Sequence, residues 1–286
     1  IERPKGRLFY MTERIDTYKL ANGMIVLGVP MAQVQSAAFD FLLPCGASAL
    51  PDGCCGASAV IEDWIFRGVG GKTSRELTGL LDGLGLHRGS NIESKHITLS
   101  AALEAENIDK AIELYADIIL KPALDNEQFE FSRQLALHEL AALDDDPRHK
   151  TMLLLCEHFY PDPLGRSPEG NKEDLQKFSA ERCKKIINDN FNFSETVFAV
   201  AGKYDFQKLC SQAEKLFGSE KPKNAKTITS KKQTPGYYHY AHDGSQVHIG
   251  IMTPTVTAQS GDYYNARVAV AVLSGGMSSR LFTEVR

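Results

Sequence analysis

The order in which strands and helices alternate constrains this chain more than any other feature of its sequence. A strand-like run at residues 36–43 is followed by a Pro/Gly turn and a helical pattern through residues 59–66. The same order returns at residues 246–252, 254–261 and 264–273. Recurrence of one unit predicts a repeated module. We therefore expect two copies of one α+β unit, the second truncated, so that the natural chain continues beyond Arg286 or another chain covers the second copy.

Local patterns predict the remaining elements. Asn22-Gly23 between two apolar runs indicates a β-hairpin, and Thr73 with Glu76 resembles a capping box that opens a helix. Strands are also expected at residues 92–103 and 197–202. Helices are expected at residues 56–68, 108–120, 126–143, 152–159, 172–178, 180–190 and 206–217. Helical spacing assigns six residues of the two longest helices to the core: Ile112, Tyr115, Ile119, Phe129, Leu135 and Leu140.

Composition excludes several classes of protein. The chain has 286 residues, enough for two domains, and 32 basic against 36 acidic residues give a net charge of −4. A weakly acidic chain shows no excess of positive charge of the kind that binds nucleic acid. No apolar run approaches the ~20 residues of a membrane span. The lysine-rich residues 221–235 indicate a linker between a domain at residues 10–220 and a second domain at residues 236–286. The compartment stays open between cytoplasm and periplasm, since a targeting segment could already have been removed before Ile1.

Other catalytic and metal signatures are weak. The six cysteines are irregularly spaced and form no CxxC pair, which favours free thiols. His239 and His242 form the one close histidine pair, but they lie in a tyrosine-rich stretch without a nearby third ligand, so we interpret them as surface or strand-edge residues. Gly71-Lys72-Thr73 misses the spacing of a phosphate-binding loop, and the Gly-x-Ser-x-Gly elbow of serine hydrolases is absent.

A series of short segments, in this order and spacing, resembles the M16 metallopeptidases, the group of pitrilysin and the mitochondrial processing peptidase. The segments are residues 56–68, 90–92, 138–140 with 144–147, 163–166 with Gly170, 200–202 with 217–218, and 273–282. The resemblance covers nearly the whole chain. It implies an α+β fold in which a mostly antiparallel sheet has helices packed on one side, followed by the start of a second similar domain.

The resemblance also implies a zinc site, which this sequence has lost. Active members bind zinc through His-x-x-Glu-His on one helix and a glutamate on a later helix, because residues i and i+4 share a helix face. The matching positions are Ala59 for the first ligand, Glu62 for the general base, Asp63 for the second ligand and Glu139 for the third. Ser132 stands where the family usually has a further glutamate.

The altered ligand positions predict that the site is inert. Alanine has no donor atom, and a zinc site needs about three ligands with nitrogen or sulfur prominent, so no zinc or other cofactor is expected. A weak magnesium or calcium site of carboxylates at Glu62, Asp63 and Glu139 remains an alternative. Without a metal-bound water to deprotonate, Glu62 could serve structurally, for instance in an ion pair with Arg67.

Peptide binding is the property that the resemblance leaves in place. The family is expected to add peptides as a strand to a sheet edge, here at Ser90, Asn91 and Ile92, and Arg286 matches a substrate-binding arginine of the second half. The resemblance implies a non-catalytic subunit that forms a peptide-binding chamber with a zinc-bearing M16 partner, as a homo- or heterodimer. The alternatives are an interaction scaffold like the respiratory-complex core proteins and an active zinc endopeptidase with a divergent site.

Overall fold

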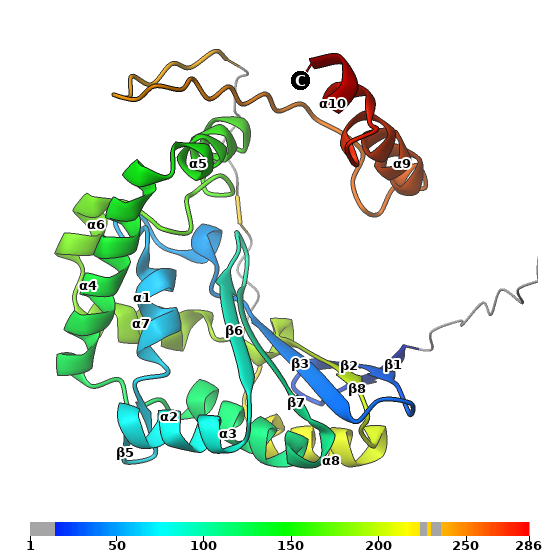
Figure 1. The fold of residues 1–286 in the computed structure, drawn as a ribbon. Coiled ribbons are helices and arrows are strands. Elements are labelled where there is room, and N and C mark those ends of the chain that lie inside the picture. Colours follow the sequence, from blue (N-terminus) through cyan, green and yellow to red (C-terminus); the bar gives the residue numbers. More distant parts are fainter. Residues whose placement is uncertain (1–14, 224–227, 230–235, 286) are drawn as a thin grey trace, which may run out of the picture. The chain divides into compact units, whose positions relative to one another are not determined.

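The computed structural model describes residues 15–223, 228–229 and 236–285. Contacts between Cα atoms divide the chain into two compact units, Ile1–His248 and Ile249–Arg286. The first unit contains the sheet and most of the helices (Figure 1). No described helix is both long enough and apolar enough to cross a bilayer.

A six-stranded sheet organises the first unit. Its strands run in the order β1-β2-β8-β3-β7-β6, where β1 is Asp16–Lys19, β2 is Ile25–Pro30, β3 is Ser36–Leu43, β6 is His87–Ile92, β7 is Ile97–Glu104 and β8 is Val197–Gly202. Every neighbouring pair is antiparallel except β2 and β8, which are parallel. The largely antiparallel α+β architecture expected from the sequence is confirmed, and strand β6 lies at one edge of the sheet.

The hairpin between β1 and β2 forms where Asn22-Gly23 predicts it. Gly23 has a φ of 98°, in the left-handed region that glycine enters without steric strain. The buried Asn22 side chain accepts a hydrogen bond from the Met24 backbone N–H at 3.1 Å and donates one to the carbonyl of Phe217 at 2.8 Å. The turn is therefore also attached to the last long helix of the unit.

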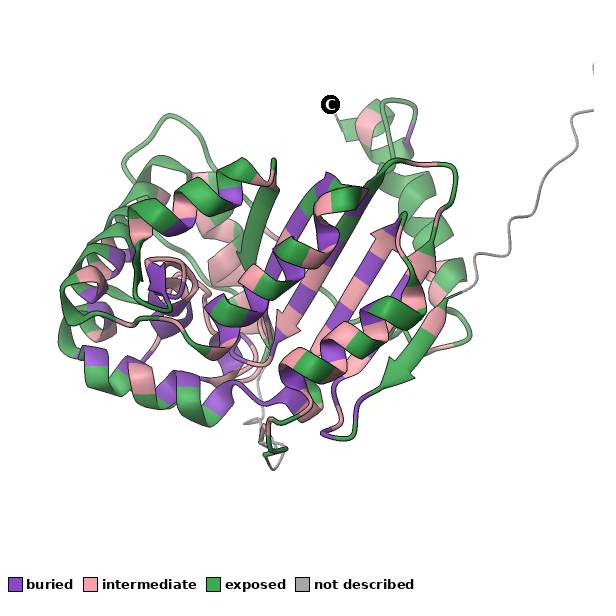
Figure 2. Ribbon diagram, turned by 90° about the horizontal axis from the view of Figure 1, so that it is seen from below, coloured by how far each residue is buried: buried purple, intermediate pink, exposed green. Residues whose placement is uncertain are grey.

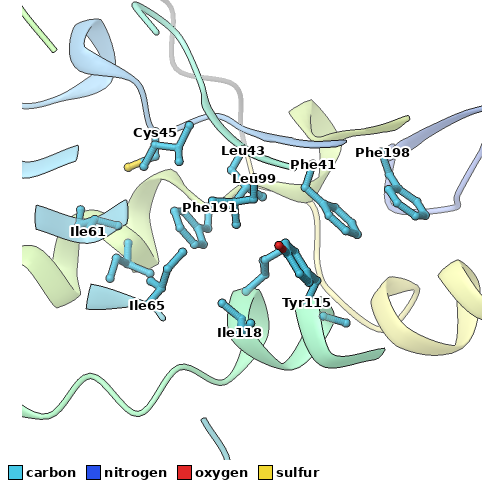
Figure 3. Close-up of a cluster of buried hydrophobic side chains, with 14 of the residues drawn as sticks. Phe41, Leu43, Cys45, Ile61, Ile65, Leu99, Tyr115, Ile118, Phe191 and Phe198 are labelled. Carbon is cyan, nitrogen blue, oxygen red and sulfur yellow. The ribbon is translucent and has the colours of Figure 1, made fainter. Parts of the chain in front are cut away.

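One face of the sheet is buried and the other is not. Alternate residues of β3, namely Ala37, Phe39, Phe41 and Leu43, are buried, whereas their neighbours are exposed or half-buried (Figure 2). Helices α3 (Ile108–Leu120) and α8 (Phe206–Phe217) contribute Tyr115 and Phe217 against this face. Phe41 stacks on Phe198 at 4.2 Å between ring centroids, with Tyr115 beside them (Figure 3). Aromatic packing of this kind fixes the sheet on its helices.

A second group of helices lies beside the β6 edge of the sheet (Figure 1). It comprises α1 (Ala57–Trp64), α2 (Ser74–Gly83), α4 (Asn126–Ala142), α5 (Pro147–Phe159), α6 (Lys172–Lys177) and α7 (Ala180–Asn190). The small two-stranded sheet of β4 (Gly68–Val69) and β5 (Lys72–Thr73) links α1 to α2. Thr73 and Glu76 form the predicted capping box of α2. Trp64 of α1 packs on Phe129 of α4 at 5.0 Å between rings, which fastens these two helices together.

Three expectations from the sequence were wrong. Residues 92–103 are not one strand, because β6 ends at Ile92 and a tight turn leads into β7 at Ile97. Residues 246–252 form no strand, since no described strand lies beside them to satisfy their backbone groups; Ile251 is 88% exposed. Leu135, expected in the core, is 40% exposed. The other five proposed core residues of α3 and α4 are buried or half-buried.

The second unit is small. It contains α9 (Tyr263–Ser274), which the helical spacing predicted, and α10 (Arg280–Val285), which it did not. Neither helix has a buried residue.

Candidate functional site

Helix α1 begins at a point where two glycine backbones touch. Gly56, the residue before α1, has a φ of 92°. A Cβ on Gly170 would lie 2.3 Å from the Cα of Gly56. Only glycine allows such an approach at these positions. The contact holds the loop that carries Pro168 and Glu169 against the start of α1.

Two adjoining hollows of about 270 and 300 Å³ lie between α1, α4, β6 and this loop. Ala59, Glu62, Ser90, Ala136 and Glu139 line both of them. Asn91, Ile92, Pro168 and Glu169 line one, and Asp63, Phe66, Arg88, Gly89, Ser132 and Leu135 line the other. The positions that match the degenerate zinc motif are thus brought together with the predicted peptide-binding residues of β6.

Glu62 is a half-buried carboxyl group that lines both hollows. Burial raises the pKa of Glu62, a hydrogen bond with the Ser90 side chain opposes that rise, and the charges of Glu139 and Asp63 add to it. A raised pKa makes a carboxylate a better proton acceptor. The Glu62 carboxylate therefore accepts a proton more readily than an exposed glutamate does.

Asp63 is held by two neighbouring side chains. The hydroxyl of Ser132, which is 1% exposed, donates a hydrogen bond to Asp63 Oδ2 at 2.5 Å. The Nε of Arg67 approaches the same oxygen at 2.5 Å. The ion pair that the sequence suggested for Glu62 is therefore made by Asp63, because Arg67 lies just beyond the end of α1 and reaches back to Asp63, whereas Glu62 lines both hollows. Ser132 and Asp63 together link α4 to α1.

Glu139 and Glu169 complete the acidic side of the hollows. Burial raises the pKa of Glu139, and the charges of Asp63 and Glu169 raise it further. Glu169 also lies 3.6 Å from the Nε2 of His149. The charge of Glu139 also raises the pKa of Glu62, because two ionised carboxylates repel each other.

The donor atoms at this site do not fit a catalytic zinc ion. Ala59 offers no ligand, and Asp63 is committed to Ser132 and Arg67. Among the residues that the structure describes, no group of three or more His, Cys, Asp or Glu side chains is arranged to hold a metal. A catalytic zinc site requires three protein ligands and an open position.

The outer edge of β6 presents free backbone groups beside the hollows. Glu93 N–H donates to the carbonyl of His96, so these two residues form a hydrogen-bonded pair at the end of the β6–β7 ladder. In an antiparallel ladder, such pairs alternate with pairs whose N–H and C=O groups point outward. The N–H and C=O groups of Ser90 and Ile92 therefore point away from β7. Since β6 ends the sheet, these groups face the sheet edge. Arg286, the other expected substrate-binding residue, lies outside the described residues.

The sequence interpretation missed several lining residues. Phe66 is four residues after Glu62 within the helix expected at residues 56–68, and Leu135 is four residues before Glu139, so the expected helical spacing places each on the same face as a candidate residue. That spacing was the signal that could have identified them. Arg88 is two residues before Ser90, so the alternation of strand β6 places both side chains on one face of the sheet.

Two family models match successive parts of the chain. Residues 31–171 match the family model described as "Insulinase (Peptidase family M16)", and residues 177–286 match the model described as "Peptidase M16 inactive domain". The second match does not include α1 or α4. An uncharacterized zinc protease from Rickettsia felis is 28% identical over 284 residues, covering 96% of this chain and 68% of that protein. The mitochondrial-processing peptidase subunit beta of Saccharomyces cerevisiae is 26% identical over 203 residues, covering 71% of this chain and 44% of that protein.

Solved structures show the same fold. A peptidase M16 inactive domain from Pseudomonas fluorescens has a TM-score of 0.79 at 18% identity. A protease from Helicobacter pylori has a TM-score of 0.77 at 20% identity. Each match covers 96% of this chain and 68% of the other. With both M16 models matched in succession and the M16 fold present, this chain belongs to the M16 peptidase family.

Proposed function

We propose that the chain is a non-catalytic M16 subunit that binds peptides in a chamber completed by a zinc-bearing M16 partner. The proposal rests on the two residues of α1 that stand at the zinc-ligand positions of the family. Ala59 has no donor atom, and Asp63 is engaged by Ser132 and Arg67. A general base such as Glu62 has no metal-activated water to deprotonate there.

The edge of β6 supports the peptide-binding part of this proposal. An extended peptide can pair with the outward backbone groups of Ser90 and Ile92, which gives affinity with little dependence on sequence. The adjoining hollow offers apolar surface from Phe66 and Leu135 for a side chain of that peptide. These features serve binding and need no metal.

The proposal is tested by measuring binding and cleavage separately on the purified chain. We expect a fluorescent unfolded peptide to bind and to remain intact, with zinc well below one ion per chain after desalting. A peptide N-methylated at alternate residues cannot donate its hydrogen bonds to the edge and should bind at least about tenfold more weakly, since several backbone hydrogen bonds are lost. The same peptide methylated on the other alternate set is the matched control.

Two outcomes would favour the competing functions. The first competing function is that of an active endopeptidase, because relatives of this chain are named zinc proteases. Metal-dependent cleavage that is abolished by Glu62→Gln would establish that activity and overturn our proposal. Failure of the chain to bind any peptide, alone or together with a co-purified M16 subunit, would favour an interaction scaffold.

A further inference from the structure

A third hollow, of about 330 Å³, lies between helix α7 and the segment that leads from β3 to α1. It shares no lining residue with the two hollows beside β6. Its lining consists of three residues before α1 and five residues of α7: Ala49, Leu50, Pro51, Arg182, Lys185, Ile186, Asp189 and Asn190. A cavity of this volume is at the small end of the range for ligand sites. The hollow therefore has room for a ligand of a few residues at most.

Four of the lining residues share one face of α7. Arg182, Lys185, Ile186 and Asp189 follow one another at intervals of three, one and three residues. Arg182 lies in the first turn of α7 and Asp189 in the last. A helix dipole favours acidic side chains in the first turn and basic ones in the last. This order of charges therefore does not stabilise the helix, and it places a positive and a negative end along the hollow.

These charges have no ionic partners among the residues that the structure describes. Arg182 Nε donates a hydrogen bond to Cys54 Sγ at 3.4 Å, and its two terminal nitrogens bond to none of those residues. Lys185 and Asp189 are four residues apart, a spacing at which ion pairs form on a helix. They nevertheless pair neither with each other nor with another of the described residues. Opposite charges held apart in this way remain available to a ligand.

The walls of the hollow are apolar and held in place. Leu50 and Ile186 are 5% and 3% exposed. The Nη1 of Arg166 donates a hydrogen bond to the carbonyl of Leu50 at 2.8 Å, and the Nδ2 of Asn190 donates one to the carbonyl of Ala49 at 3.4 Å. Because these bonds fix the segment before α1 against α7, a ligand loses little free energy in ordering the site.

We propose that this hollow binds a short peptide of two or three residues whose ends are both charged. Lys185 and Arg182 bind its carboxylate, Asp189 binds its ammonium group, and an apolar side chain of the peptide lies against Leu50 and Ile186. The site is separate from the edge of β6 and does not depend on the zinc positions.

The spacing of the charges selects the length of the peptide. A helix rises about 1.5 Å per residue, so Asp189 is about 6 Å along α7 from Lys185 and about 10 Å from Arg182. An extended peptide spans about 3.3–3.6 Å per residue. Two residues therefore match the first distance and three residues the second, whereas the charges of a single amino acid are too close together to reach both ends.

Titration calorimetry of the whole chain with leucyl-leucine tests the proposal. N-acetylation of the dipeptide removes its ammonium group, and C-amidation removes its carboxylate. Each change should weaken binding at least about tenfold, the effect of losing one charge-assisted hydrogen bond. Free leucine should also bind more weakly than the dipeptide. Equal affinity for the free, acetylated and amidated forms, or no measurable binding of the free dipeptide at millimolar concentration, would overturn the proposal.

Variants of the hollow assign each end of the dipeptide. Asp189→Asn should weaken binding of free leucyl-leucine but not of its acetylated form, and Lys185→Gln should weaken the free but not the amidated form. Lys184→Gln is the matched control, because it makes the same charge change one residue away, where Lys184 bonds to Asn126 outside the hollow.

Comparing ligands on one variant separates recognition of the ends from a general loss of folding. A loss in Asp189→Asn that is the same for free and acetylated dipeptide, or equal losses in the two lysine variants, would contradict the site. Binding at the edge of β6 uses backbone groups of that strand, so it would not respond to these variants.

Discussion

The hydrogen bond between Ser132 and Asp63 is the residue-scale feature that distinguishes this site. It joins α4 to α1, the two helices that carry the positions matching the zinc ligands of the family. Because Ser132 is buried and Asp63 also pairs with Arg67, the link needs no metal. We infer that the carboxylate of Asp63 now has a structural role.

Replacing Ser132 tests that role directly. Ser132→Ala should lower the free energy of unfolding by about 2 kcal/mol, the typical value of a hydrogen bond to a charged group. Ser211→Ala is the comparison variant, because the exposed Ser211 hydroxyl donates to the carbonyl of Gln207 four residues earlier, as the Ser132 hydroxyl does to that of Gln128. The control should change stability by less than about 0.5 kcal/mol. Equal losses of unfolding free energy in the two variants, measured by urea denaturation, would contradict a structural role of Asp63.

The raised pKa of Glu62 predicts how the stability of the protein depends on pH. The pKa of Glu62 is raised above the ordinary 4.5, so the folded protein binds this proton more tightly than the unfolded chain does. Ionisation of Glu62 as the pH rises above 4.5 therefore opposes folding. Glu62→Gln, which stays neutral, should gain stability relative to the wild type between about pH 4 and pH 8. Melting temperatures across this range provide the measurement, and a difference that does not depend on pH would contradict it.

At the scale of elements, the orientation of α1 toward α4 can be tested by rebuilding the ligand pair. Ala59→His combined with Asp63→His places two imidazoles four residues apart on the face that shares a hollow with Glu139. Zinc affinity should rise by orders of magnitude over the wild type, and Ala59→His alone should give a much smaller gain. Hydrolysis need not return, because the supporting shell has not been rebuilt.

The rebuilt pair also affects the helix contact. Asp63→His removes the acceptor of Ser132 and the partner of Arg67, so the double variant should be less stable without zinc and should recover stability when zinc is added. Titration calorimetry and thermal melts measure the two effects. Absence of any gain in zinc binding by a folded double variant would mean that Glu139 does not face α1.

At the scale of the whole molecule, the second unit has an apolar helix face that its own residues leave open. Tyr264, Val268 and Val272 lie four residues apart on α9 and are 78%, 64% and 58% exposed. An exposed stripe of this kind favours association. We expect the chain to form dimers or soft aggregates at high concentration.

Light scattering on a pair of lysine variants tests this expectation. Val268→Lys places a charge in the stripe and should shift the chain toward monomer. Ala266→Lys, which adds a charge of the same sign on the opposite face of α9, should not. A monodisperse monomer with a single cooperative melt in the unmodified chain would show that the stripe does not drive association.

The sequence alone determined those features that depend on neighbouring residues. The hairpin at Asn22-Gly23, the capping box at Thr73 and the limits of α3, α7 and β8 follow from backbone preferences and from the spacing of apolar residues, which act within a few positions. Motif spacing also indicated the M16 resemblance. It aligned four residues with the zinc-site positions of that family: Ala59, Glu62, Asp63 and Glu139.

Tertiary structure decided which of these residues meet. Asp63 is committed to Ser132 because α4 crosses α1, a contact 69 positions apart that no local pattern encodes. Residues 246–252 alternate like a strand but form none, since a strand needs a partner for its backbone hydrogen bonds. Leu135 lines a hollow because the helix face it shares with Glu139 packs beside β6 at the sheet edge. Contacts between distant segments depend on how whole elements pack, and that information is not contained in any one stretch of sequence.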